Sequence, residues 1–196
     1  MLAEEIKNYD IKQLKELAET LRGQIVERVR ENGGHLSSNL GAVEITLALH
    51  KVFSFPEDKL IFHVGHQRYA HKLLTGRDLS RLRQEGGESG FPDPEESAYD
   101  PFIAGHSGTS VALGIGLCNA RALAGGKEKA ICLIGDAALG NGVALESVFS
   151  SEKKPDNFVV VLNDNGRSIA QKNSALYRAV HKASAKNRQR QFHPVW

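Results

Sequence analysis

The chain has 196 residues, of which 41% are hydrophobic and 24% are charged, and its formal net charge at pH 7 is +2. This length suits one globular domain with one sizeable core, and the charge is too small to argue for a nucleic-acid partner. No apolar run reaches the roughly 18 residues that cross a bilayer, and the polar start MLAEEIKNYD does not look like a signal peptide, so we expect a cytoplasmic protein without a membrane partner.

The first third of the chain has helical periodicity. Apolar residues at three- and four-residue steps predict an amphipathic helix over residues 11–32, with Asp10 as its N-cap and Gly33-Gly34 as its stop. A second helical pattern covers residues 42–53. The apolar run 59–64 predicts a short buried strand that ends at Gly65, and two short helices are expected within residues 66–84.

Residues 85–107 have a different character. They contain glycine, proline, serine and acidic residues without periodicity. The segment is too long for a simple connection, and long ordered loops are more often functional than not.

The rest of the chain alternates between helix and strand. A helix rich in small residues is predicted at 108–124, followed by a strand at 129–134, a helix at 141–151 and a strand at 158–163. This order predicts an α/β fold, a three-layer parallel sheet flanked by helices, with its site at the carboxyl ends of the strands. Residues 1–177 would form this domain, and the basic residues 178–196 a poorly ordered tail or frayed helix.

Two further properties concern side chains in the predicted helices and strands. Cys118 and Cys132 lie in apolar runs, so we expect both thiols to be buried and reduced. The helix 108–124 is our candidate for self-association, because Gly114 and Gly116 would permit close packing against another element.

A pair of polar tips suggests a metal site. Asp136 and Asn165 each follow an apolar run, and one predicted helix separates the two runs. Strand tips that lie side by side would present two oxygen ligands, which suits Mg²⁺ bound to a diphosphate. The backbone carbonyl of Arg167 could add a ligand, and the helix that begins near Ala138 would direct its N-terminus and the N–H groups of Ala137 and Ala138 at the diphosphate. Taken singly, neither motif indicates a metal site, because an aspartate after a strand often caps a helix and Asn163-Asp164-Asn165 is also an ordinary turn sequence.

Several histidines lie in turns. His35 follows Gly33-Gly34, where the alternative is a local cap, and His66 follows a strand end. His106 lies in Gly105-His106-Ser107, which enters a helix N-terminus, a place where anions bind. His50 and His63 are predicted to be packing residues within apolar segments, and His71 a structural residue of a helix. The strand, turn and helix context of His63, His66 and His71 does not favour a metal site made by these three.

The chain closely resembles the N-terminal part of the 1-deoxy-D-xylulose-5-phosphate synthase family, which belongs to the transketolase-like thiamine-diphosphate (ThDP) enzymes. The resemblance is carried in order by GGHLSSNLGAVEITLALHKVF (33–53), KLIFHVGHQRYAHKLLTGR (59–77), FPDPEESAYDPFIAGHSGTS (91–110), CLIGDAALGNGVALE (132–146) and VVVLNDNGRSIAQKNSAL (159–176). The patterns VGHQxYxHKxLTGR and GHSxTS separate this family from ordinary transketolases.

The resemblance implies a role for each matching residue. His66 and Gly105-His106-Ser107 would contact ThDP, and Ala137 and Ala138 would touch its diphosphate through their backbones. Asp136, Asn165 and the Arg167 carbonyl would hold Mg²⁺, with Asn165 also contacting the cofactor. His35 and His66 would be the catalytic histidines, with His35 transferring or orienting a proton near the reacting carbon. In the family, pyruvate loses CO₂ and the remaining fragment joins glyceraldehyde 3-phosphate.

The chain departs from the family pattern at two places. Ala137 stands where the family has glycine, which would cost about 1 kcal/mol or more if that backbone needs a positive φ. Gly166-Arg167 replaces an acidic residue and a methionine. The pyrimidine-binding domain, whose glutamate activates the cofactor, has no counterpart here, and Glu146 reads as an ordinary helix residue.

Two functions follow from these observations. The first is the diphosphate-binding part of a synthase that works in a homo-oligomer or with a separate pyrimidine-binding chain and is inactive alone. The second is a truncated or degenerate relative that acts as a binding or scaffold domain. A generic nucleotide binder is disfavoured, because the sequence contains neither a P-loop nor a GxGxxG fingerprint.

Overall fold

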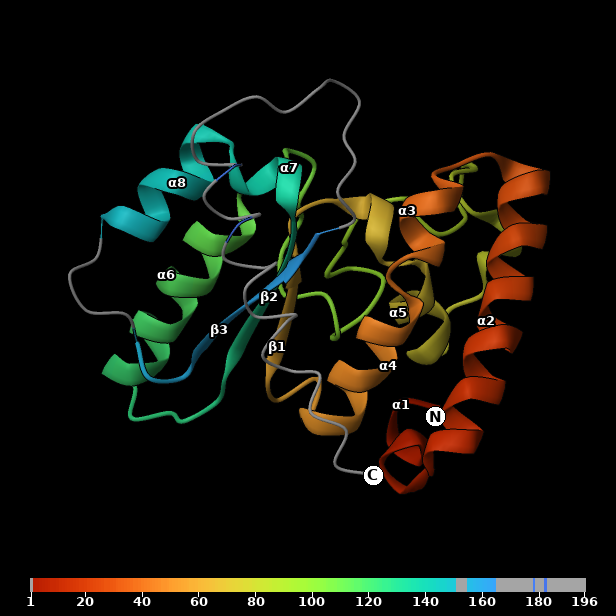
Figure 1. Ribbon diagram of the computed structural model, residues 1–196, viewed down its shortest axis with the longest axis horizontal. Coiled ribbons are helices and arrows are strands. Elements are labelled where there is room, and N and C mark those ends of the chain that lie inside the picture. The colour runs from red at the N-terminus through yellow and green to blue at the C-terminus, as the bar shows by residue number, and fades with distance from the viewer. Residues whose placement is uncertain (1, 151–154, 165–177, 179–181, 183–196) are drawn as a thin grey trace.

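The computed structural model describes residues 2–150, 155–164, 178 and 182. Three parallel strands, β1 (Lys59–Phe62), β2 (Ala130–Gly135) and β3 (Phe158–Asn163), lie in the order β1-β2-β3. Helices α6 (Ser110–Leu123) and α8 (Gly142–Phe149) cover one face, and the helices of the N-terminal half cover the other (Figure 1). The predicted α/β fold, a parallel sheet between two helical layers, is confirmed.

The longest helix, α2 (Ile11–Asn32), begins and ends where its sequence predicts. The Asp10 side chain accepts a hydrogen bond from the Gln13 N–H, and the Gln13 side chain accepts one from the Asp10 N–H, both at 2.8 Å. This capping box satisfies two N–H groups that the first turn leaves without partners. At the other end Gly33 adopts φ +73°, which ends the helix and turns the chain toward His35.

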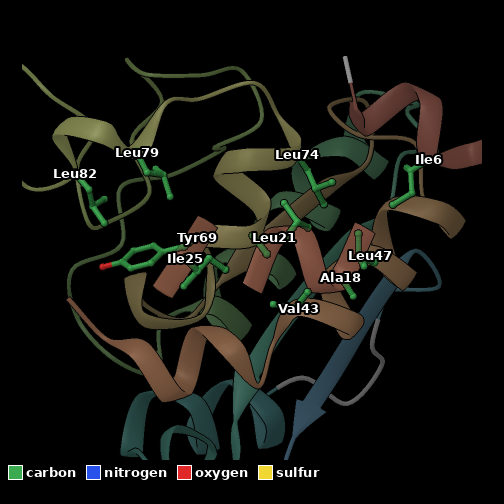
Figure 2. Close-up of a cluster of buried hydrophobic side chains, with 11 residues drawn as sticks. Ile6, Ala18, Leu21, Ile25, Val43, Leu47, Tyr69, Leu74, Leu79 and Leu82 are labelled. Carbon is green, nitrogen blue, oxygen red and sulfur yellow. The ribbon is translucent and has the colours of Figure 1, made fainter. Parts of the chain in front are cut away.

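The N-terminal helices pack around their own core, shown in Figure 2. Besides α2 it receives side chains from α4 (Val43–Val52), α5 (Tyr69–Leu74) and the 3₁₀ turns η1 (Ile6–Asn8) and η3 (Leu79–Arg81). Each buried leucine or isoleucine contributes roughly 2 kcal/mol of stability. The buried members are Ile6, Ala18, Leu21, Ile25, Val43, Leu47, Tyr69, Ala70, Leu74, Leu79 and Leu82.

Strands β1 and β2 are buried on both faces. Leu60 and Phe62 of β1 pack with α4, whereas Ile61 between them packs with α6, as the two-residue repeat of a strand requires. All six residues of β2 are buried. This is why the strands read as continuous apolar runs in the sequence.

Helix α6 lies against the sheet of its own chain. A Cβ built on Gly114 would lie 2.4 Å from Cys132 Sγ and 2.6 Å from the Phe158 ring, so the glycine allows α6 to approach the sheet closely. Gly116 has open space around it. Cys118 and Cys132 are both buried and free, as predicted.

Three elements differ from the sequence analysis. Where the sequence analysis expected a turn at His35, the residues that follow it form the short helix α3 (Leu36–Leu40). The helix expected to begin near Ala138 is two elements, α7 (Asp136–Leu139) and α8, because Gly140 ends the first and Asn141 caps the second. A short helix α1 (Leu2–Glu5) precedes η1. The predicted tail 178–196 lies outside the described residues, except for Arg178 and Lys182.

Candidate functional site

The carboxyl ends of β2 and β3 lie side by side. Gly135 pairs with Asn163 across the two parallel strands, so Asp136 and Asp164 directly follow paired positions. Asp136 begins α7 and is partly exposed. Asn165 and Arg167, the other two predicted metal ligands, lie outside the described residues. Within the described ranges, no group of three or more His, Cys, Asp or Glu side chains could hold a metal ion.

Two of the predicted histidines lie together at the end of β1. His66 belongs to the 3₁₀ turn η2 (Gly65–Gln67), which follows the strand. His35 is the residue at the N-cap position of α3, and its side chain makes no capping hydrogen bond. Their ring centroids are 5.9 Å apart, and the His63 ring contacts His66 edge-on at 4.8 Å. The structure therefore brings His35 and His66 together although more than twenty-five residues separate them in the chain.

Burial keeps the inner histidines neutral near pH 7. Burial, reinforced by the nearby His35, holds the pKa of His66 below its ordinary value. Burial also lowers the pKa of His63 to about 4. A neutral imidazole offers one donor and one acceptor, so His66 can bind a polar ligand through either nitrogen. His63 is buried at the base of this group, in agreement with its predicted packing role.

The segment Gly105-His106-Ser107 forms an exposed loop before α6. Its end lies against the start of α8, because the Asn141 side-chain amide donates to the Ser107 carbonyl at 3.1 Å. Gly108 adopts φ +86° and passes so close to Asn141 that a Cβ would lie 2.9 Å from it. Through Asn141, the loop is held beside the segment that begins at Asp136.

The backbone of Ala137 carries no strain. Ala137 lies within α7, and among the described residues Arg83 is the non-glycine residue with a positive φ. The alanine therefore replaces a glycine at a position that needs no glycine conformation. Ala137 is exposed at the strand tip, whereas Ala138 is buried against the α6 and α8 side of the sheet.

Sequence reasoning missed two polar residues beside the site. Gln67 is 6% exposed, its Oε1 has no partner in the described structure, and its Nε2 lies 3.9 Å from the Cβ position of Gly135. Asn39 is buried and joins His35 to α5. The signal for Gln67 was its position directly after His66 at a strand end. Asn39 had none, because α3 was not predicted.

These features fit a diphosphate as a ligand, and toward a metal ion the described residues supply one strand-tip carboxylate, that of Asp136. The Asp136 carboxylate stands at one strand tip, and the exposed loop at 105–107 and the first turn of α7 at Ala137 offer backbone N–H groups. Gln67, in the turn after β1, has a buried side-chain oxygen without a partner in the described structure. A buried polar atom without a partner is uncommon in a native protein unless a water or ligand completes it.

The fold is that of transketolases. The structure superposes on a transketolase from Leishmania mexicana with a TM-score of 0.70 at 17% sequence identity, covering 88% of this chain and 34% of that one. The sequence profile of the 1-deoxy-D-xylulose-5-phosphate synthase family matches residues 2–194. The chain belongs to this family.

Curated relatives support the same assignment at higher identity. A 1-deoxy-D-xylulose-5-phosphate synthase from Dehalococcoides mccartyi is 48% identical over 174 residues, which cover 88% of this chain and 28% of the relative. The corresponding protein of Bordetella petrii is 49% identical over 178 residues, which cover 89% of this chain and 28% of that protein. The chain thus spans somewhat more than a quarter of the length of these relatives.

Proposed function

We propose that the chain is the diphosphate-binding part of a 1-deoxy-D-xylulose-5-phosphate synthase-like transferase, which binds ThDP and Mg²⁺. The observation that carries the proposal is the convergence of three segments at one edge of the sheet: the Asp136 tip, the His66 turn and the Gly105–Ser107 loop. Family membership supports it. Ligands of α/β proteins bind at this edge of a parallel sheet.

The proposed roles follow the chemistry of each group. Asp136, with Asn165 and the Arg167 carbonyl, would hold Mg²⁺, an ion that prefers oxygen ligands. Ala137, Ala138 and the Gly105–Ser107 loop, through His106, would bind the cofactor. When bound, ThDP supplies the electron sink for decarboxylation of pyruvate and addition to glyceraldehyde 3-phosphate. His66 would bind the cofactor as a neutral imidazole.

His35 is proposed to handle a proton at the reacting carbon. Its side chain is exposed at the start of α3, and its ring faces that of His66. A histidine side chain there could donate or accept a proton at the reacting atoms. The family's activating glutamate would have to come from a second chain or from another part of the protein.

The proposed partner is therefore a pyrimidine-binding chain or domain, or a second copy of this chain. Apolar side chains exposed on α6, α8 and β3 offer contact surface for it: Leu123, Phe149 and Val160. We further propose a cytoplasmic location, which the two free thiols support.

Titration calorimetry with Mg²⁺ and ThDP tests the site directly. We expect the wild-type chain to bind and Asp136→Asn to weaken binding about tenfold or more, because a neutral amide replaces a charged metal ligand. Glu146→Gln is the matched control. It makes the same charge change on an exposed residue of α8 and should leave the affinity unchanged.

The result separates the two candidate functions. Binding by the wild-type chain with loss in Asp136→Asn supports the synthase component, and CO₂ release from pyruvate after adding a pyrimidine-binding chain would extend it to activity. No binding by the wild-type chain would favour a scaffold domain. Backbone strain at Ala137, which would have favoured the scaffold, is absent.

A further inference from the structure

A cluster of buried and partly buried ionisable side chains joins α5 to the loop that follows η3. All three cations come from residues 68–77, namely Arg68, Lys72 and Arg77, and all three acids come from residues 88–100, namely Glu88, Glu96 and Asp100. Lys72 pairs with Glu96, and its Nζ lies 3.6 Å from Glu88 Oε2. The long loop noted in the sequence is therefore held to α5 by opposite charges.

Asp100 is the centre of this cluster. One of its oxygens pairs with Arg68 Nη2, and the other accepts from Arg77 Nη1 at 2.5 Å and from the Asp93 N–H at 3.0 Å. His71 Nε2 lies 3.4 Å from the carboxylate. Asp100 and Arg68 are 2% and 1% exposed, so both charges are removed from water.

The central pair is charged at neutral pH. Burial acts to raise the pKa of Asp100, but the nearby His71 and the hydrogen bonds and charges of Arg68 and Arg77 outweigh it, so the pKa lies far below its usual range. Burial lowers the pKa of Arg68 only to about 10. A buried ion pair of this kind costs so much desolvation that it adds little net stability, and its value lies in fixing one arrangement.

The arrangement that Asp100 fixes includes two segments of the proposed site. Arg68 follows His66 by two residues, and Asp100 precedes Gly105 by five. The Arg68 guanidinium also lies over the Phe62 ring of β1, 5.3 Å from its centroid. Independently, the loop touches the His66 turn, because a Cβ on Gly65 would lie 2.0 Å from the Gly90 carbonyl oxygen.

We propose that Asp100 is a positioning residue, which sets the placement of the His66 turn relative to the Gly105–Ser107 loop by binding Arg68 and Arg77 at once. The proposal rests on the proposed function, since both segments belong to the ThDP site. Asp100 is 2% exposed, so it would touch neither cofactor nor substrate. It acts through the two segments that do, and its loss should lower cofactor affinity rather than only stability.

The test uses the full chain with the substitution Asp100→Asn, which keeps the shape and removes the charge. Calorimetry with Mg²⁺-ThDP, well below the unfolding midpoint, should give a dissociation constant about tenfold higher than that of the wild type, the usual scale for losing a supporting contact. Leu21→Ala, in the core of the N-terminal helices, is the control. It should lower the unfolding midpoint and leave the dissociation constant unchanged.

Hydrogen exchange without cofactor gives a second readout. Asp100→Asn should speed exchange in residues 65–69 and in residues 103–109 together, whereas Leu21→Ala should not. If Asp100→Asn does not fold, Arg77→Lys, which keeps the charge but loses the two-pronged contact, should give a smaller effect in the same direction.

The outcomes separate this proposal from the function on which it rests. Unchanged affinity in Asp100→Asn beside a wild type that binds overturns the positioning role. If the wild type itself does not bind, the proposed function fails. Hydrogen exchange alone then tests whether Asp100 couples the His66 turn to the Gly105–Ser107 loop. Faster exchange in only one of the two segments contradicts the coupling.

Discussion

Asn39 shows how one buried amide determines the place of a candidate catalytic residue. Its Nδ2 donates to the His35 carbonyl at 2.6 Å, and its Oδ1 accepts from the Tyr69 N–H at 2.9 Å. The first contact holds the start of α3, and the second holds the start of α5, which follows the His66 turn. A single side chain therefore connects the backbones beside both histidines.

Replacing this amide tests its role at the residue scale. Asn39→Ala should lower the free energy of unfolding by about 1–3 kcal/mol, because a buried N–H and a carbonyl lose their partners. Chemical denaturation monitored by circular dichroism measures the change.

The control lies in the same short helix. Ser37→Ala changes an exposed residue and should stay within about 0.5 kcal/mol of the wild type. Equal stability of Asn39→Ala and the wild type would show that water replaces the amide at no cost.

The packing of α6 on the sheet is decided by its glycines. Gly114 faces Cys132 and Phe158 at distances that exclude a methyl group, whereas a methyl group on Gly116 would meet nothing within 4 Å. The two glycines, two residues apart in one helix, therefore differ in how they tolerate a larger side chain. The sheet face of α6 requires a small residue, and the other face does not.

This difference gives a prediction at the scale of the element. Gly114→Ala should destabilise the protein by about 1–3 kcal/mol, because the added methyl forces α6 away from the sheet. Gly116→Ala should stabilise it by up to about 1 kcal/mol, because alanine favours a helix more than glycine does. Thermal unfolding of both variants measures the changes, and shifts in the same direction would contradict the packing.

At the scale of the whole molecule, buried titratable groups couple stability to pH. Burial lowers the pKa of His50 to about 2 and those of His63 and His71 to about 4. Each stays neutral in the folded protein but takes up a proton in the unfolded chain below its ordinary value of 6.5. Burial and the neighbouring Glu96 raise the pKa of Glu88 to about 7, which has the opposite effect.

The three histidines outweigh the one glutamate. As the pH falls from about 6.5 to about 5, the free energy of unfolding should decrease, by roughly 1.4 kcal/mol per pH unit for each extra proton that the unfolded chain binds. Urea denaturation at several pH values measures this slope. Asp100 does not contribute in this range, because its carboxyl is ionised in both states.

Two variants change the slope in opposite directions. His50→Gln removes one histidine contribution and should flatten the decrease. Glu88→Gln removes the opposing contribution and should make the decrease steeper, since between about pH 4.5 and pH 7 the folded protein holds that proton and the unfolded chain does not. The same slope in all three proteins would contradict these assignments.

Local signals were strong enough to predict most of the elements. The capping residues around α2, the helical repeat of α4 and the apolar runs of the three strands each contain their cause within a few neighbouring residues, and the structure confirms them. The short elements α3 and α7 were missed, because so few residues carry no recognisable periodicity and depend on contacts from elsewhere.

The sequence alone also determined the family and the candidate residues, because the motifs are local strings of letters. Only the tertiary structure decided which of these residues meet: it brought His35 to His66, held the Gly105–Ser107 loop beside Asn141, and buried Asp100 between two arginines. Such contacts join residues that are distant in the chain. They arise when the helices and the sheet pack and exclude water, which no local pattern encodes.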